Sequence, residues 1–207
     1  MDGVLTDSEP AFHAAVNDVL ARFDEHISID DYRPFIGTPT PEMWRQMAAL
    51  KRLDTDPARL TEEYEAPLMA RLRQLRPPLP GARELIDALR ARRVPIALCT
   101  ASYARWADAI LESAGLTGLF DAISTPELVS ATKPDPAPYV LAAKLLGLEP
   151  AACIAVEDST PGVTSALRAG AYVIQLRATR TAADPVPGVA SVIASLAEFP
   201  MELLAAD

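Results

Sequence analysis

The sequence is poor in the features that mark several classes of protein. Its 207 residues include two cysteines and two histidines, and acidic residues outnumber basic ones to give a formal net charge of −9. No CxxC spacing is present, so neither a disulfide framework nor a cysteine-based zinc site is indicated. The acidic balance argues against dedicated nucleic-acid binding, which needs a basic face. No apolar run approaches the roughly 18 residues of a membrane span.

The cysteines and the N-terminal residues indicate the cellular compartment of the protein. Cys99 and Cys153 lie beside apolar, strand-like runs, and we expect both to be buried, reduced thiols. The first residues lack a basic stretch followed by an apolar one, so no signal peptide is predicted. We therefore expect a cytoplasmic protein, a monomer or weak dimer, with neither nucleic acid nor a membrane as its partner.

The chain divides into two regions with different sequence patterns. Residues 9–76 carry apolar side chains at helical spacing and contain no convincing strand. In the last helix predicted there, from about residue 57 to residue 75, one stripe holds Leu60, Tyr64, Leu68 and Leu72. The Pro- and Gly-rich segment Pro77–Gly81 then marks a boundary.

Beyond this boundary, short apolar runs alternate with helical segments. The predicted strands are Val94–Cys99, Cys153–Val156, Tyr172–Leu176 and Val189–Ala194. Strands that alternate with helices form right-handed βαβ units and a parallel sheet. Ligands of such sheets bind at the carboxyl ends of the strands, which is where we look for chemistry.

The first two polar motifs lie at the start of the chain and directly after the first predicted strand. The segment DGVLTDSEP, Asp2 to Pro10, holds an acidic pair that we expect to follow a strand, and here it opens the chain. A simpler interpretation is a turn, because Asp-Gly is a favoured turn dipeptide. Thr100 directly follows the run PIALC and precedes Ala101 and Ser102. A hydroxyl and helix-start N–H groups form an anion site, although Thr100 or Ser102 could equally be an ordinary N-cap.

Two further motifs contain charged residues. Lys133 lies in ATKPDP, and it is either a solvated surface charge or a side chain aimed by the rigid Pro-Asp-Pro that follows. Glu157 and Asp158 directly follow the run CIAV. Adjacent carboxylates repel each other unless a cation lies nearby, and hard oxygen ligands suit Mg²⁺. The alternative is an N-cap by Asp158 or Ser159.

In this order the four motifs resemble the haloacid dehalogenase superfamily. More narrowly, they are similar to the branch of β-phosphoglucomutase and phosphoglycolate-type phosphatases. The resemblance covers essentially the whole chain. It implies an α/β fold with a Rossmann-like parallel sheet core and an inserted all-helical cap domain. The core would comprise residues 1–8 and 77–207, with its first strand missing, and the cap residues 9–76.

The resemblance also implies roles for individual residues. The first motif of the family reads Asp-x-Asp-Gly, and Met1 occupies the x, so the nucleophile and its strand would precede residue 1. Asp2 would be the general acid/base and a Mg²⁺ ligand through its carbonyl. Asp158 would be the principal metal carboxylate, with Glu157 a second ligand or an orienting residue.

The phosphate-binding residues follow from the same resemblance. Thr100, with the amides of Ala101 and Ser102, would bind the phosphate, and Lys133 would screen its charge. Asp2 points to phosphate esters, because the similar dehalogenases and phosphonatases lack an Asp there. We therefore predict a Mg²⁺-dependent phosphatase that hydrolyses a small phosphorylated metabolite through an aspartyl-phosphate.

Two alternatives remain open. A phosphosugar mutase of the β-phosphoglucomutase type would need the same missing Asp. Such members carry an arginine shortly after the glycine of the specificity loop, where this chain has Thr38 after Gly37. This departure weakens the mutase interpretation, and Gly37 and Thr38 become the candidates for substrate specificity. The second alternative is a non-catalytic fragment that binds phosphate or a partner.

Overall fold

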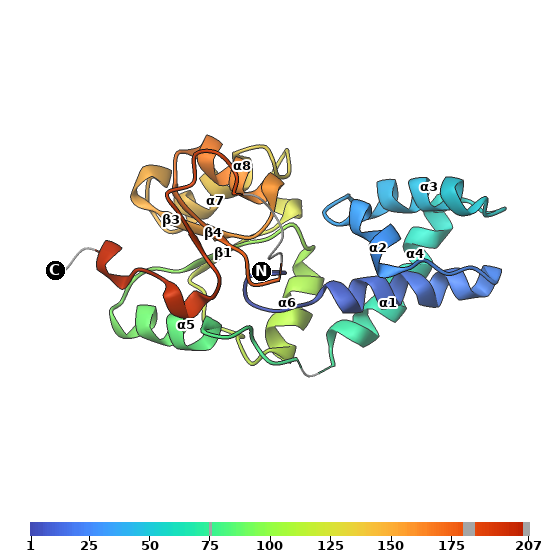
Figure 1. The fold of residues 1–207 in the computed structure, drawn as a ribbon, viewed down its shortest axis with the longest axis horizontal. Coiled ribbons are helices and arrows are strands. Elements are labelled where there is room, and N and C mark those ends of the chain that lie inside the picture. Colours follow the sequence, from blue (N-terminus) through green and yellow to red (C-terminus); the bar gives the residue numbers. More distant parts are fainter. Residues whose placement is uncertain (75, 180–184, 205–207) are drawn as a thin grey trace. The chain divides into compact units, whose positions relative to one another are not determined.

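The computed structural model describes residues 1–74, 76–179 and 185–204, and the chain divides into two compact units (Figure 1). The core unit comprises Met1–Asp7 and Leu75–Asp207, and the helical unit comprises Ser8–Gln74. The sequence-based prediction set these boundaries at residues 8 and 76. Within the described ranges, no helix is long and apolar enough to cross a membrane.

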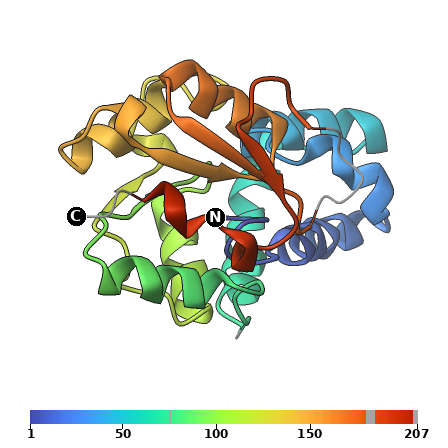
Figure 2. The ribbon, with the colours of Figure 1, turned by 60° about the vertical axis from the view of Figure 1, so that its left-hand side comes forward.

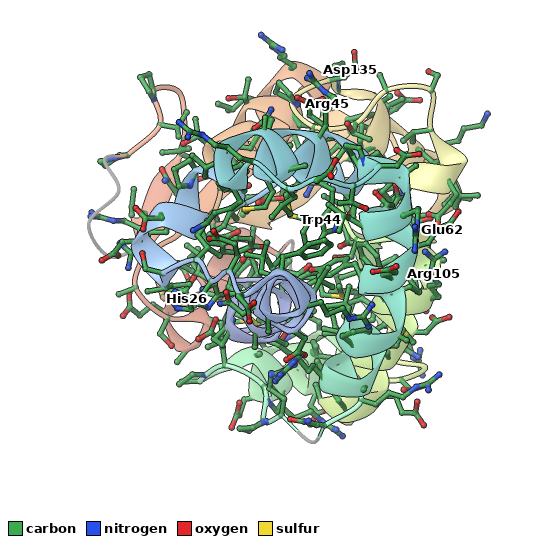
Figure 3. All side chains as sticks on the ribbon, turned by 90° about the vertical axis from the view of Figure 1, so that its right-hand side faces the viewer. His26, Trp44, Arg45, Glu62, Arg105 and Asp135 are labelled. Carbon is green, nitrogen blue, oxygen red and sulfur yellow. The ribbon has the colours of Figure 1, made fainter. Side chains whose placement is uncertain are left out.

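The helical unit contains no strand among its described residues, as predicted. Its elements are α1 (Glu9–Leu20), η1 (Ala21–Phe23), α2 (Ile29–Tyr32), η2 (Arg33–Phe35), α3 (Thr40–Lys51) and α4 (Pro57–Leu72). The predicted stripe of α4 is buried in full, and α4 packs against α1 and α3. Trp44, which is fully buried, points into the space between these helices and meets the ring of Tyr64 edge-on at 5.6 Å (Figure 3).

The core unit alternates strands and helices, and every strand pair in it is parallel. Its longer elements are α5 (Ala82–Ala91), β1 (Ala97–Cys99), α6 (Ala104–Ser113), β2 (Ala122–Ser124), α7 (Ala137–Leu145), β3 (Ile154–Glu157), α8 (Thr160–Ala169), β4 (Tyr172–Leu176) and β5 (Ser191–Ile193). Short 3-10 turns complete it: η3 (Pro126–Leu128), η4 (Pro150–Ala152), η5 (Leu196–Glu198) and η6 (Met201–Leu203). The predicted α/β class with a helical insert is confirmed.

The strands agree with the predicted runs to different degrees. The bounds of β4 are those predicted, whereas β1 begins only at Ala97. The prediction missed β2, which pairs with β1 in the register Ala97↔Ala122. Three residues without a β-branched run are too weak a signal to stand out. The two cysteines are free and half-buried, so they are less enclosed than expected.

The described strands form two sheets, β1-β2 and β3-β4-β5. The start of the chain lies close to both. Met1 is buried, Asp2 accepts a hydrogen bond from Ser102, three residues after β1, and Gly3 adjoins Asp158, the residue after β3. Figures 1 and 2 both draw the N-terminus among the elements of the core unit. The first motif therefore lies at the carboxyl ends of the strands, where ligands of such folds bind.

Candidate active site

The first motif folds into a tight turn beside the end of β3. The N–H of Gly3 donates to the carbonyl oxygen of Thr6 at 2.8 Å, and Gly3 has φ +72°. A Cβ at Gly3 would lie 2.2 Å from Oδ2 of Asp158, so only glycine fits both the conformation and the space. The turn interpretation is thus correct, and the turn also brings the first motif against the last one.

The second motif connects Thr100 to Asp2. The Oγ1 of Thr100 accepts from the N–H of Ser102 at 3.0 Å, and the Oγ of Ser102 donates to Oδ2 of Asp2 at 2.9 Å. Thr100 and Ser102 are both buried. The N-cap of α6 is Tyr103, without a side-chain hydrogen bond, so the alternative of an N-cap by Thr100 or Ser102 is wrong. These hydroxyls belong to a buried polar cluster at the end of β1.

Lys133 is not a surface charge. Its side chain is 10% exposed, and its Nζ donates to the carbonyl oxygen of Cys99 at 3.2 Å and to Oε1 of Glu157. The Nζ also lies 5.1 Å from the ring centroid of Tyr139, a cation–π distance. The alternative of a solvated lysine is therefore wrong, and the ammonium is held between the ends of β1 and β3.

Glu157 uses both of its carboxylate oxygens. Besides Lys133, Oε1 accepts from the hydroxyl of Tyr139 at 2.7 Å. Oε2 accepts from the N–H of Asp158 at 3.2 Å and from the hydroxyl of Ser159 at 3.3 Å. The Oγ of Ser159 in turn accepts from the N–H of Gly162 at 3.1 Å and caps α8, so this part of the N-cap alternative is confirmed.

The buried charges keep one another ionised. Burial disfavours the charge of Glu157, but the neighbouring ammonium of Lys133 outweighs it and holds the pKa of Glu157 below its ordinary value. Burial likewise opposes the charge of Lys133, and Glu157 raises its pKa above the ordinary value. At neutral pH the site therefore contains a buried ammonium next to a buried carboxylate.

Asp158 and the backbone carbonyl of Asp2 are better placed than Glu157 to bind a divalent cation. Gly3, the residue after Asp2, packs directly against the carboxylate of Asp158, which brings Asp2 and Asp158 close together, whereas both oxygens of Glu157 accept hydrogen bonds from Lys133, Tyr139 and Asp158. No cluster of three or more His, Cys, Asp or Glu residues suited to a metal occurs in the described part of the chain. Mg²⁺ typically takes one or two protein carboxylates and keeps several waters, so Asp158 and Asp2 fit it.

Sequence patterns did not reveal every residue of this site. Tyr139 and Gly162 both contact or adjoin Glu157, yet neither belongs to a pattern with a chemical meaning of its own. The specificity candidates Gly37 and Thr38 lie in the helical unit between η2 and α3, in a turn where the N–H of Thr38 donates to the carbonyl of Phe35 at 3.0 Å.

Comparisons with known proteins agree with this architecture. Residues 1–170 match the haloacid dehalogenase-like hydrolase family. The chain is 30% identical over 179 residues to the fructose-1-phosphate phosphatase YqaB of Escherichia coli K12, covering 86% of this chain and 93% of that protein. It is 30% identical over 202 residues to hexitol phosphatase B of the same strain, covering 96% and 91%.

A solved structure extends the likeness to the fold. The crystal structure of CbbY from Rhodobacter sphaeroides in complex with phosphate superposes with a TM-score of 0.85 at 23% identity, covering 97% of this chain and 93% of that one. This agreement covers both the parallel sheets and the helical insert. The chain is therefore a hydrolase that belongs to the haloacid dehalogenase-like family.

Proposed function

We propose that this protein is a Mg²⁺-dependent phosphatase that hydrolyses a small phosphorylated sugar or sugar alcohol. The observation that carries the proposal is the buried ammonium of Lys133, held between the carbonyl of Cys99 and Glu157 at the carboxyl ends of β1 and β3. The substrate class is supported by the two relatives at 30% identity, a fructose-1-phosphate phosphatase and a hexitol phosphatase.

The phosphate would be bound at the end of β1. Thr100 supplies a hydroxyl, Ala101 a backbone N–H and Lys133 a positive charge. The N–H of Ser102 donates to Oγ1 of Thr100 in this structure and would orient that hydroxyl toward the phosphate. A carboxylate that approaches a phosphate at about 4 Å is repelled by roughly 4 kcal/mol per charge pair at an effective dielectric of about 20. The ammonium of Lys133 offsets this repulsion and stabilises charge on the phosphate oxygens.

The remaining carboxylates have distinct tasks. Asp158 and the backbone carbonyl of Asp2 would hold Mg²⁺, which when bound contributes positive charge beside the phosphate. We assign Glu157 to the orientation of Lys133, because its oxygens are engaged by other donors. The carboxyl of Asp2, held by Ser102 at 2.9 Å, gives a proton to the leaving oxygen and later takes one from water. Such acid/base assistance contributes about 10²–10⁴-fold in rate.

The nucleophile would be an aspartate joined directly to the nitrogen of Met1, as the Asp-x-Asp-Gly pattern of the family implies. Asp2, the next residue, accepts a hydrogen bond from the hydroxyl of Ser102 beyond β1, and Gly3 adjoins Asp158 beyond β3. A residue bonded to the nitrogen of Met1 would lie close to the same strand ends as Lys133. Its carboxylate would attack phosphorus to form an aspartyl-phosphate as the sugar oxygen leaves, and water would then hydrolyse that intermediate.

Substrate choice would fall to the helical unit, acting as the cap. Gly37 has φ +84° in the turn before α3, and Thr38 follows it where mutase-like members have an arginine. Because this chain offers no such cation there, hydrolysis is favoured over mutase chemistry. We expect Thr38→Ala to change KM among sugar phosphates while leaving kcat within about twofold.

The test is the release of inorganic phosphate from a panel that includes fructose 1-phosphate and hexitol phosphates, with the protein expressed from its full reading frame. We expect turnover with Mg²⁺ that stops on chelation, and a loss of at least 10²-fold in kcat for Asp2→Asn. Isomerisation of a hexose phosphate without phosphate release would favour the mutase. Phosphate binding without turnover of any substrate would reduce the protein to a binding module.

A further inference from the structure

Tyr139 contacts both members of the buried ion pair. It lies in the first turn of α7, a helix that packs against β1, β2 and α8. Its hydroxyl donates to Oε1 of Glu157 at 2.7 Å, and the centre of its ring lies 5.1 Å from Nζ of Lys133. The ring packs against a core cluster that includes Val163 and Val173, which holds the hydroxyl in place.

We propose that Tyr139 is a positioning residue for phosphate binding, which fixes the carboxylate of Glu157 and through it the ammonium of Lys133. This inference rests on the proposed role of Lys133 as a phosphate ligand. Tyr139 itself would touch neither the substrate nor the metal.

The geometry explains why the ion pair needs a third partner. Lysine is a flexible side chain with three rotatable donors. If the carboxylate of the ion pair could turn, the ammonium would move with it. Here the carbonyl of Cys99 and Oε1 of Glu157 each take one donor, which leaves one for a phosphate oxygen. The Oε2 end of the carboxylate is held by the N–H of Asp158 and the hydroxyl of Ser159, and the hydroxyl of Tyr139 shares Oε1 and fixes the end that faces Lys133.

The hydroxyl also limits how strongly Glu157 competes with the substrate for the ammonium. A carboxylate oxygen that accepts a second hydrogen bond has part of its charge neutralised and attracts the lysine less. Burial and the charge of Glu157 raise the pKa of Tyr139 well above its ordinary value, so the phenol remains a donor at working pH. Tyr139 thus anchors the pair and keeps Lys133 available for phosphate.

A double-mutant cycle separates this role from simple packing. We would measure the Kd for inorganic phosphate in the presence of Mg²⁺ by calorimetry for the wild type, Tyr139→Phe, Lys133→Met and the double variant. Phenylalanine keeps the packed ring and removes only the hydroxyl. We expect Tyr139→Phe to weaken binding by about 3- to 10-fold, the effect of one hydrogen bond, and to add less than about twofold in the Lys133→Met background. Tyr172→Phe, at an exposed tyrosine of β4, is the matched control and should bind as the wild type does.

The outcomes distinguish the inference from the function on which it rests. A wild type that binds phosphate no better than Lys133→Met would overturn the role of Lys133 and the proposed function with it. If Lys133→Met weakens binding but Tyr139→Phe has no effect, or the same effect in both backgrounds, only the positioning role fails. Melting temperatures are measured for each variant. If Tyr139→Phe does not fold, Glu157→Gln takes its place in the cycle, and equal losses in both backgrounds would again refute action through Lys133.

Discussion

Gly162→Ala tests the close packing of Gly162 against the carboxylate of Glu157. Gly162 is the third residue of α8, and its φ is that of an ordinary helix, so alanine meets no backbone strain. By propensity alone the change should stabilise the protein by about 0.5–1 kcal/mol. The structure predicts the opposite sign, because an added Cβ would lie 2.2 Å from Cδ and from Oε2 of Glu157.

The size of the destabilisation depends on how far the carboxylate of Glu157 must move. The carboxylate of Glu157 has to shift by roughly 1 Å or more to reach an ordinary contact distance, which strains or breaks its bonds to Lys133 and Tyr139. Overpacking of a core typically costs about 1–3 kcal/mol, and a buried ion pair that loses its partner costs about 3–5 kcal/mol. Since the pair can relax in part, we expect a net destabilisation of about 1–4 kcal/mol.

Urea unfolding, followed by circular dichroism, measures this change directly. Thr164→Ala, two residues further along the same helix and half-buried, is the control, and we expect it to stay within about 1 kcal/mol of the wild type. Phosphate affinity measured on the same samples should fall for Gly162→Ala only. A Gly162→Ala protein that is as stable as the wild type and binds phosphate equally well would refute the close packing of Gly162 against the carboxylate of Glu157.

Three further predictions concern stability. Leu68→Ala in the fully buried stripe of α4 should cost about 2–5 kcal/mol in urea unfolding, and a loss below 1 kcal/mol would contradict that burial. The bidentate pair of Arg71 with Asp18, with both contacts at 2.7 Å and about one third of each side chain exposed, should give a coupling of only about 0.5–1 kcal/mol in a double-mutant cycle. The N–H of Ile96 lowers the pKa of Asp121, so this carboxylate favours folding above its ordinary pKa of 3.8 and loses that contribution as pH falls below it. Asp121→Asn should therefore make the free energy of unfolding depend less on pH below 3.8. An unchanged pH dependence there would count against the hydrogen bond from Ile96 to Asp121.

The helices were more predictable than the strands, for a physical reason. A buried stripe such as that of α4 repeats every three to four residues over several turns, so many positions report the same face. In contrast, β2 has only three residues, too few for periodicity to register, and β1 and β5, also of three residues, fill only half of the apolar runs that predict them. The position of β2 is defined by its pairing with β1, a contact between segments distant in the chain.

For the candidate site as well, local sequence patterns predicted some features and only the structure showed others. Thr100 and Glu157 each directly follow a predicted strand, and this local pattern was enough to identify both as candidate site residues. What each side chain does depends on partners far away in sequence. The bond from Ser102 to Asp2 spans 100 residues, and that from Lys133 to Glu157 spans 24. No spacing rule anticipates such contacts, because they depend on how the turns after different strands meet.

The sequence by itself therefore determined the family, the alternation of strands and helices, and the kinds of chemical group at the ends of the strands. These are local properties, written in periodicity and in the residues that follow each strand. Only the tertiary structure decided that Lys133 is buried and held between two strands, and that Tyr139 takes part in holding it. Burial and partners set the charge and direction of a side chain, and both arise only when distant segments pack together.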